Sequence, residues 1–443
     1  NGGPGCSSMD GLVYENGPWV FDDNGTELRV NPYTWNANAS VLYLETPIGV
    51  YDADVCLYTN FFTIGGFSNG TNLVFNDTFT AQDNDRAIRQ FLLKFPEYQN
   101  NEFYISGESY AGIYIPSLAQ TIHWSNVAGK TPLVNLKGVA IGNGVVDTND
   151  QDSLLGSFGV LARHNVVPYE SVFTFEDVCI KNYDPDTCSN FVNNAYANTF
   201  GDNGQIPLNP YNLYSTCYND SNQTLPPEFQ FDYTRFKRLQ KARNLERLGA
   251  INPFVNKAFA LLCYIEIIIA DLPPCADILG ATFFFNNMTV KQALHVDTNI
   301  TWSICSQTLN VRAKLFAKSK AFISFLDNSG DFANMSATYG FLIQQGYRVI
   351  YYSGDADTVC PIDSAQIFFK QLTKTYNLPN TVPKKPWHIP GLYPDEPQTT
   401  GFYEDYNNFR FISFMGVGHM VPQWNRPGAQ KMITTFIHNL PLD

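Results

Sequence analysis

The sequence predicts an α/β fold, in which a mostly parallel sheet is covered by helices on both faces. Two observations predict it: short β-rich runs alternate with helical patterns at both ends of the 443-residue chain, and several of these runs end at turns of small residues. Strands that alternate with helices are typical of a parallel sheet. The length suits one large domain or two ordinary ones.

The predicted elements follow in order along the chain. A short apolar run (VLYL) before Pro47 predicts a buried strand, and a helical pattern that stops before Pro96 predicts a helix. Gly107 ends the next strand, and a helix follows directly. The predicted strands are 41–44, 102–106, 136–141, 348–352 and 410–414, and the predicted helices are 83–95, 110–123 and 428–437.

The middle of the chain lacks this alternation of strands and helices. It holds six of the nine cysteines and a basic stretch at 235–247. We therefore expect two kinds of unit: an α/β core made of residues 1–149 and 311–443, and an inserted cap made of residues 150–310.

Composition and charge exclude several classes of function. The net charge of −13 and the pI of about 4.9 argue against nucleic acid and against anionic membrane surfaces, which attract basic patches. The cysteines form no CxxC pair and no zinc-like pattern with histidine, so we expect no metal site and no cofactor. The longest apolar run contains Glu266 and is too short to span a bilayer.

Cysteines and glycosylation sequons together indicate the secretory pathway. Nine Asn-X-Ser/Thr sequons accompany the nine cysteines, and both features are typical of proteins that fold in an oxidising compartment. The candidate glycosylation sites are Asn24, Asn38, Asn69, Asn76, Asn219, Asn222, Asn287, Asn299 and Asn334.

Ser109 is the candidate nucleophile. The segment FYISGESYAG runs from a predicted strand through Gly-Glu-Ser-Tyr-Ala into a predicted helix. Small residues flank a nucleophilic serine where the strand-to-helix turn is tight, and the common pattern is GxSxG. Here the last position is Ala111, which is still small.

A serine nucleophile needs a base, and His419 is the candidate among six histidines. It lies in GVGHMVP, directly after the last predicted strand, whereas the others lie in helical patterns, in the insertion or in a proline-rich loop. The third member of such a site is an acidic residue, which should lie in a loop after a strand between Ser109 and His419 in the sequence. The loop SGDADTVC offers both Asp355 and Asp357. The order Ser, Asp, His is that of the α/β-hydrolases.

With these pieces together, the chain resembles the serine carboxypeptidases, the vacuolar and lysosomal family of carboxypeptidase Y and cathepsin A. The matching stretches occur in order over nearly the whole chain outside the insertion. They are NGGPGCSS, GLVYENGP, NPYTWN, LETPIGV, FPEY, GESYAGIYIP, IGNG, YYSGDADTVC and GVGHMVPQWNRP.

The resemblance implies roles for residues of this chain. It makes Ser109 the nucleophile, His419 the base and Asp357 the orienting acid, with the backbone N–H groups of Gly3 and Tyr110 as the oxyanion hole. A glycine there lets the backbone approach the scissile carbonyl closely. The implied activity is removal of single residues from peptide C-termini at acidic pH through an acyl-enzyme.

The resemblance also implies a clamp for the terminal carboxylate of the substrate. Its members would be Asn1, Gly2, Glu15 and Glu108. Ionised glutamates would repel a carboxylate, so the clamp requires protonated side chains, and crowding and burial both raise carboxyl pKa values. We therefore expect binding of a free C-terminus to weaken as the pH rises.

Further expectations come from the same comparison. The resemblance implies a disulfide between Cys6 and Cys305 and a free thiol at Cys360 near the substrate pocket. Family members carry a segment and early strands ahead of the NGGPG motif, so we expect an N-terminally incomplete chain. The stretch 49–56 (GVYDADVC) departs from the family pattern.

Two other functions stay open at this point. Some relatives pass an acyl group to an alcohol, which makes an acyltransferase the first alternative, and some protect partner enzymes, which makes a non-catalytic binding role the second. The expected partner is a peptide or protein with a free C-terminus. The expected location is the secretory pathway, ending in a vacuole, a lysosome or outside the cell. The sequence does not give the oligomeric state.

Overall fold

The computed structural model describes most of the chain. The described residues are 2–3, 5–21, 28–46, 64–65, 67, 77–147, 150–200, 208–217, 279–305, 334–391 and 397–442. Asn1, the stretch 49–56 and five of the predicted sequons (Asn24, Asn69, Asn76, Asn219 and Asn222) lie outside them.

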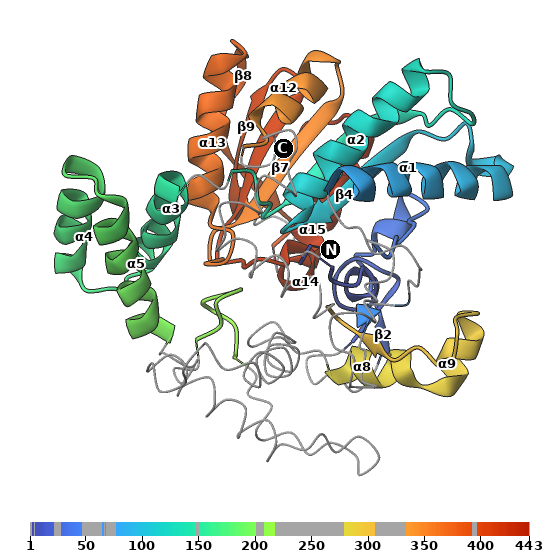
Figure 1. Cartoon of the computed structure of the whole chain (residues 1–443), viewed down its shortest axis with the longest axis horizontal. Coiled ribbons are helices and arrows are strands. Elements are labelled where there is room, and N and C mark those ends of the chain that lie inside the picture. Colours follow the sequence, from blue (N-terminus) through green and yellow to red (C-terminus); the bar gives the residue numbers. More distant parts are fainter. Residues whose placement is uncertain are drawn as a thin grey trace, which may run out of the picture.

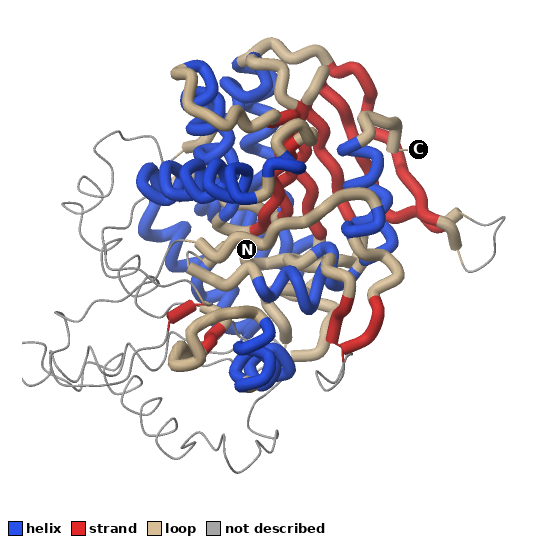
Figure 2. The backbone as a smooth tube through the Cα atoms, turned by 90° about the vertical axis from the view of Figure 1, so that its right-hand side faces the viewer, coloured by secondary structure: helices blue, strands red, loops and turns tan. Residues whose placement is uncertain are grey.

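A six-stranded mixed sheet forms the centre of the molecule (Figures 1 and 2). Its first four strands pair in parallel, and the last two add an antiparallel hairpin at one edge. This confirms the predicted α/β architecture. The spatial order is β4 (Phe103–Glu108), β5 (Leu136–Gly142), β7 (Arg348–Gly354), β10 (Phe409–Phe414), β9 (Gln398–Tyr406) and β8 (Asn380–Ile389).

Helices cover both faces of this sheet, as the alternation along β7 shows. Val349 and Tyr351 pack into the hydrophobic cluster under the helices of one face, whereas Ile350 and Tyr352 pack into the cluster on the other. Successive side chains of a strand point to opposite faces, so a central strand is apolar throughout. The first face carries α1 (Asp77–Lys94), α2 (Ala111–Val127), α12 (Ser336–Gln344) and α13 (Ile362–Thr375), and the second carries α15 (Arg426–Ile437).

The other elements outside the central sheet and its covering helices are short. They include η1 (Gly11–Glu15), the antiparallel pair β1 (Trp19–Phe21) and β2 (Leu28–Val30), and two 3₁₀ turns, η2 (Trp35–Ala37) and η3 (Pro96–Tyr98). The two-residue strand β3 (Ile64–Gly65) pairs in parallel with β6 (Trp302–Ser303), and α14 (Val421–Trp424) precedes α15.

The helices between β5 and α12 form two groups outside the sheet, α3 to α5 at the left and α8 and α9 below it in the view of Figure 1. The first group has its own hydrophobic cluster around Phe158 and Phe175, and a disulfide joins Cys179 to Cys188. The boundaries of the inserted cap stay a prediction. The helices are α3 (Asp150–Arg163), α4 (Tyr169–Phe175), η4 (Glu176–Lys181), α5 (Pro185–Phe200), α8 (Leu279–Asn286) and α9 (Met288–Ala293).

The strand predicted at 41–44 is wrong. These residues run as a loop on the far side of a cavity of about 810 Å³ from the edge of β4, and they make no ladder there. An apolar run becomes a strand only where a neighbouring strand accepts its backbone hydrogen bonds. Among the described residues, β4 is paired on one side alone, by β5.

The proline-rich loop predicted around His388 is also wrong. His388 lies in β8, which pairs with β9 at the sheet edge in spite of Pro383 and Pro386. Proline is tolerated on edge strands, where its missing N–H disrupts only one ladder. No helix within the described residues is long and apolar enough to span a membrane.

Candidate active site

Ser109 lies at a strained turn between β4 and α2. Its φ of 62° is in the left-handed region, which a residue with a side chain adopts only when its surroundings enforce it. Hydrogen bonds enforce it here: Ser109 N–H donates to Gly142 O at 3.0 Å, and its carbonyl accepts from Gly112 and Val145. The turn also needs a glycine at 107, because a Cβ there would lie 2.6 Å from the Cβ of Ala111.

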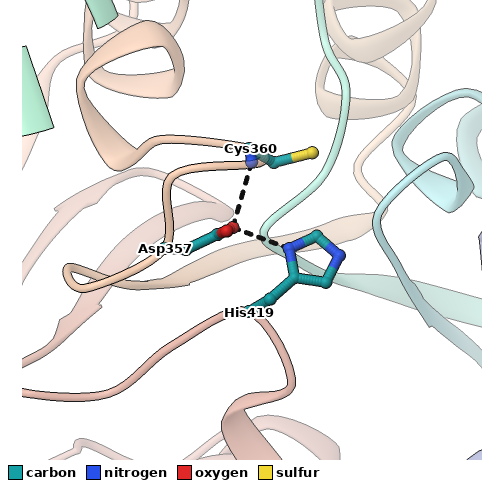
Figure 3. Close-up of side chains that lie close together, drawn as sticks. All are labelled: Asp357, Cys360 and His419. Atoms are coloured by element: carbon teal, nitrogen blue, oxygen red, sulfur yellow. Dashed lines mark hydrogen bonds and ion pairs between the residues drawn. The ribbon is translucent and has the colours of Figure 1, made fainter. Parts of the chain in front are cut away.

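His419 and Asp357 form a buried pair after strands β10 and β7 (Figure 3). His419 Nδ1 lies 2.6 Å from Asp357 Oδ2, and the two residues are 3 % and 0 % exposed. A carboxylate only accepts hydrogen bonds, so Nδ1 carries the proton. In the neutral ring, Nε2 is then the free base.

Asp357, rather than Asp355, faces the histidine. Its carboxylate accepts further hydrogen bonds from the backbone N–H groups of Val359 and Cys360, at 2.8 and 3.1 Å. Asp355 instead accepts from Gly416 N–H at 2.7 Å. The structure therefore separates two aspartates that the sequence left equivalent.

Two residues of this arrangement were not predicted from the sequence. Asn143, fully buried after β5, donates to Asp357 Oδ2 at 2.9 Å and accepts from Gly354 N–H. Its position in IGNG, at the end of a predicted strand, was the available signal. Tyr211 accepts from His419 N–H through its carbonyl at 2.7 Å, and its ring packs against the imidazole. No motif indicated that contact.

The thiol of Cys360 lies close to the His419–Asp357 pair, since its sulfur is within 4.8 Å of ligand atoms of both residues. No hydrogen bond joins Ser109 to His419 among the interactions of the described residues; such bonds often tighten only when substrate binds. Cys360 is a free cysteine. Burial, followed by the charge of Asp357, raises the pKa of its thiol well above the ordinary value, so it stays neutral and weakly nucleophilic.

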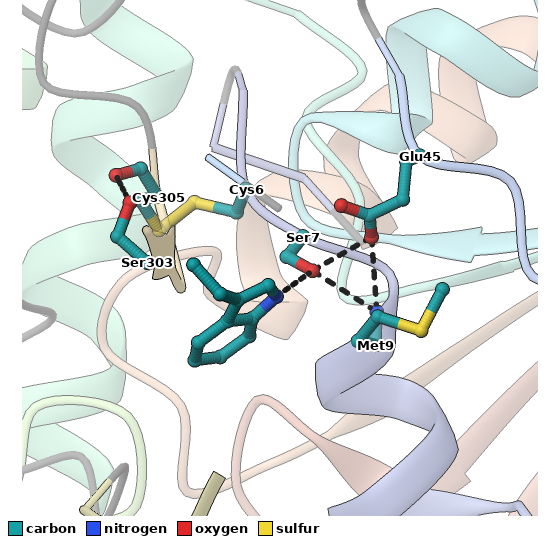
Figure 4. Close-up of a disulfide and its surroundings, with 7 residues drawn as sticks. Cys6, Ser7, Met9, Glu45, Ser303 and Cys305 are labelled. Atoms are coloured by element: carbon teal, nitrogen blue, oxygen red, sulfur yellow. Dashed lines mark hydrogen bonds between the residues drawn. A yellow bond between two sulfur atoms is a disulfide. The ribbon is translucent and has the colours of Figure 1, made fainter. Parts of the chain in front are cut away.

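The Gly2–Gly3 turn lies directly against Ser109. A Cβ on Gly2 would be 2.5 Å from Tyr110 N and 2.6 Å from Ser109 Cβ. Gly3 has a φ of +119°, which side chains rarely allow. A disulfide joins Cys6, just after this turn, to Cys305, which lies two residues beyond β6 (Figure 4).

Three acidic side chains gather beside this turn. The carboxylates of Asp10, Glu15 and Glu108 lie within 4.8 Å of one another. Burial, followed by the charge of Glu15, raises the pKa of Glu108 well above its ordinary value. Asp10 was not predicted, although it stands in the same NGGPGCSSMD stretch.

Four of the predicted glycosylation sites fall on described residues. Asn38, Asn287, Asn299 and Asn334 are all exposed, as attachment of a glycan requires. Asn287 also caps α9, because its side chain accepts from Thr289 and Val290 N–H.

The strained serine, the buried His–Asp pair and the mostly parallel sheet define a serine hydrolase of the α/β-hydrolase class. A sequence profile of the serine carboxypeptidase family matches residues 1–439. The chain belongs to this family and is a serine-type carboxypeptidase.

Individual relatives agree with the family assignment. The chain is 30 % identical to the lysosomal protective protein of Mus musculus over 452 residues, which cover 100 % of this chain and 84 % of the relative. It is also 30 % identical to serine carboxypeptidase ctsa-4.1 of Caenorhabditis elegans, covering 99 % and 83 %. A prohormone-processing carboxypeptidase of Saccharomyces cerevisiae shares the fold, with a TM-score of 0.68 at 19 % identity, covering 99 % and 82 %. The substrates are therefore peptides, and the disulfides agree with the secretory pathway.

Proposed function

We propose that Ser109, His419 and Asp357 form a catalytic triad that hydrolyses the C-terminal peptide bond of peptides and proteins at acidic pH. The observation that carries the proposal is the buried Asp357–His419 hydrogen bond of 2.6 Å at the same edge of the sheet as the strained Ser109 turn. His419 Nε2 takes the proton of Ser109 Oγ as Oγ attacks the scissile carbonyl.

The protonated His419 then gives this proton to the leaving amino acid, and the peptide stays bound to Ser109 as an ester. Water then attacks the ester carbonyl while His419 removes its proton, and His419 returns that proton to Ser109 Oγ as the shortened peptide leaves. Asp357 holds the imidazole in the required tautomer and stabilises its positive charge.

The backbone N–H groups of Gly3 and Tyr110 are the proposed oxyanion hole. The close packing of Gly2 on Tyr110 N supports this, because it brings the two backbones together beside Ser109. Such donors stabilise the negative charge of the tetrahedral intermediate. The N-terminal end of α2 adds the positive end of a helix dipole.

The proposed clamp for the substrate's terminal carboxylate consists of Asn1, Gly2, Glu15 and Glu108. Its support is the raised pKa of Glu108, which keeps that side chain protonated and able to donate to a carboxylate at acidic pH. As the pH rises through this pKa, Glu108 ionises and repels the substrate. The clamp therefore makes the enzyme an exopeptidase that works in acid.

The location and modification of the protein are part of the same proposal. We propose that it passes through the secretory pathway to a vacuole, a lysosome or the outside of the cell, carrying glycans on its sequons. A net charge of −13 suits an acidic compartment, where fewer carboxylates are ionised.

A fluorophosphonate probe tests the triad. We expect it to label Ser109 in the full chain, as read by mass spectrometry of the peptide that contains it. Ser109→Ala should lose both the label and peptide hydrolysis, and His419→Ala should label far more slowly. Labelling of a different serine, with activity retained in Ser109→Ala, would contradict the assignment.

A further inference from the structure

Ser7 lies just after the Gly2–Gly3 turn, and its hydroxyl uses its donor and both of its acceptor positions in hydrogen bonds. It donates to Glu45 Oε1 at 2.6 Å and accepts from the indole N–H of Trp302 at 3.1 Å and from Met9 N–H at 3.2 Å. A hydroxyl offers one donor and two lone pairs, so its orientation is fixed. Ser7 is only 2 % exposed, so a lost partner would leave a buried polar group unsatisfied.

Glu45 accepts hydrogen bonds from two other segments, and Figure 4 shows those from the segment of Ser7 and Met9. One carboxylate oxygen accepts from Ser7 Oγ and from Met9 N–H at 3.2 Å. The other accepts from Phe67 N–H at 3.0 Å. These three hydrogen bonds attach the stretch from Ser7 to Met9 to residues 45 and 67.

Backbone hydrogen bonds connect Ser7 and its neighbour Cys6 to the Gly2–Gly3 turn. Cys6 N–H donates to Gly2 O at 3.1 Å, which closes the turn, and Ser7 N–H donates to Ile304 O at 2.6 Å. Ser7 is thus held through both its backbone and its side chain, a few residues from Gly3. A shift of Ser7 would move the turn relative to Ser109.

We infer that Glu45 is a positioning residue for the oxyanion hole. Through Ser7 it holds the Gly2–Gly3 turn at the distance from Ser109 that the tetrahedral intermediate requires. The inference rests on the proposed function, in which the Gly3 N–H stabilises the oxyanion. It adds a residue that acts on the transition state without contact to the substrate.

The test compares Ser7→Ala, Glu45→Ala and Glu45→Gln in the full chain, with a free-acid peptide as substrate. We expect both alanine variants to lower kcat by about 10- to 100-fold, because a displaced oxyanion donor affects the transition state more than the bound substrate. KM should rise by a smaller factor, because Gly2 in the same turn belongs to the proposed carboxylate clamp. Glu45→Gln keeps an oxygen that accepts from Ser7 and Met9, so it should retain most of kcat. Binding of a peptidyl phosphonate, which mimics the tetrahedral state, should weaken by the same factor as kcat/KM.

Ser125→Ala is the matched control. Ser125 is 4 % exposed and donates to Asp85 at 2.9 Å, so it makes the same kind of buried serine–carboxylate bond. It lies near the far end of α2, roughly 20 Å along the helix from the nucleophile. It should lower Tm about as much as Ser7→Ala does and leave kcat unchanged.

The outcomes separate the two claims. An active wild type, an inactive Ser109→Ala and a Ser7→Ala variant with lowered Tm but wild-type kcat would overturn the role of Glu45 alone. A loss confined to KM would overturn it as well. Activity retained in Ser109→Ala would instead overturn the proposed triad.

Discussion

Asn143 donates a hydrogen bond to the carboxylate oxygen of Asp357 that also accepts from His419. The two distances are 2.9 and 2.6 Å, and all three residues are almost completely buried. The amide therefore takes part in aiming the acid at the imidazole. Its backbone, with a φ of 37°, is held by Asn143 N–H donating to Tyr352 O.

Replacing Asn143 by alanine should reduce both activity and stability. It leaves a buried carboxylate with one donor fewer, which costs about 1.5–3 kcal/mol of unfolding free energy, and it lets the Asp357 side chain rotate away from His419. We expect kcat to fall at least tenfold. Asn126→Ala is a control: Asn126 bonds Arg89 and Val134 away from the site, so it should affect Tm and not kcat. Unchanged kcat in Asn143→Ala would show that Asp357 is aimed without it.

Gly2→Ala should impair catalysis with little effect on folding of the core. The added Cβ would press on Tyr110 N and Ser109 Cβ, so the turn must move away from the nucleophile. Loss of one oxyanion donor typically lowers kcat by about 10²–10³-fold, and steady-state kinetics would show it. Gly129→Ala controls for the substitution itself, because Gly129 has a positive φ and no atom within 4 Å of its Cβ position. That variant should lower Tm alone.

Asp77 should make stability depend on pH in the acidic range. Burial raises its pKa from 3.8 to about 6, although the hydrogen bond from Tyr110 lowers it. The unfolded chain therefore loses this proton first, so the contribution is fully present below about pH 4 and is lost as the pH rises to 6. Asp77→Asn cannot ionise. Its Tm relative to wild type should rise between pH 4 and 6, and a constant difference would contradict the shift.

The two described disulfides should differ in their effect on stability. Cys6–Cys305 closes a sequence separation of 299 residues, whereas Cys179–Cys188 closes one of 9. Longer loops lose more chain entropy on closure. We expect the double alanine variant at Cys6 and Cys305 to lose more unfolding free energy than the variant at Cys179 and Cys188, by about 3 kcal/mol. Equal losses in urea unfolding would contradict this.

The sequence predicts the parallel part of the fold, and it singles out two of the three residues of the proposed triad. Ser109 and His419 each follow a strand that its apolar residues predict. Because the carboxyl ends of parallel strands lie at the same edge of a sheet, the two residues are expected at that edge. The choice between Asp355 and Asp357 depends on where a turn directs each side chain. The sequence pattern alone left it open.

What the sequence does not predict depends on neighbours distant along the chain. The run at 41–44 has a strand composition but makes no ladder, because it faces a cavity instead of a paired strand. Asn143, Glu45 and Tyr211 act through residues far away in sequence, and no local periodicity marks them. The edge strand β8 is the opposite case: its prolines predict a loop, but pairing with β9 makes it a strand.

Hydrolysis of matched peptides tests the central claim most directly. We would measure kcat/KM for release of the last residue from a peptide with a free C-terminus and from its C-terminal amide, between about pH 4.5 and 8, with Ser109→Ala as control. The account predicts fast release from the free acid at acidic pH, slow release from the amide, a preference that declines as Glu108 ionises, and no activity in Ser109→Ala. Equal turnover of acid and amide at every pH would contradict the clamp, and activity in Ser109→Ala would contradict the triad.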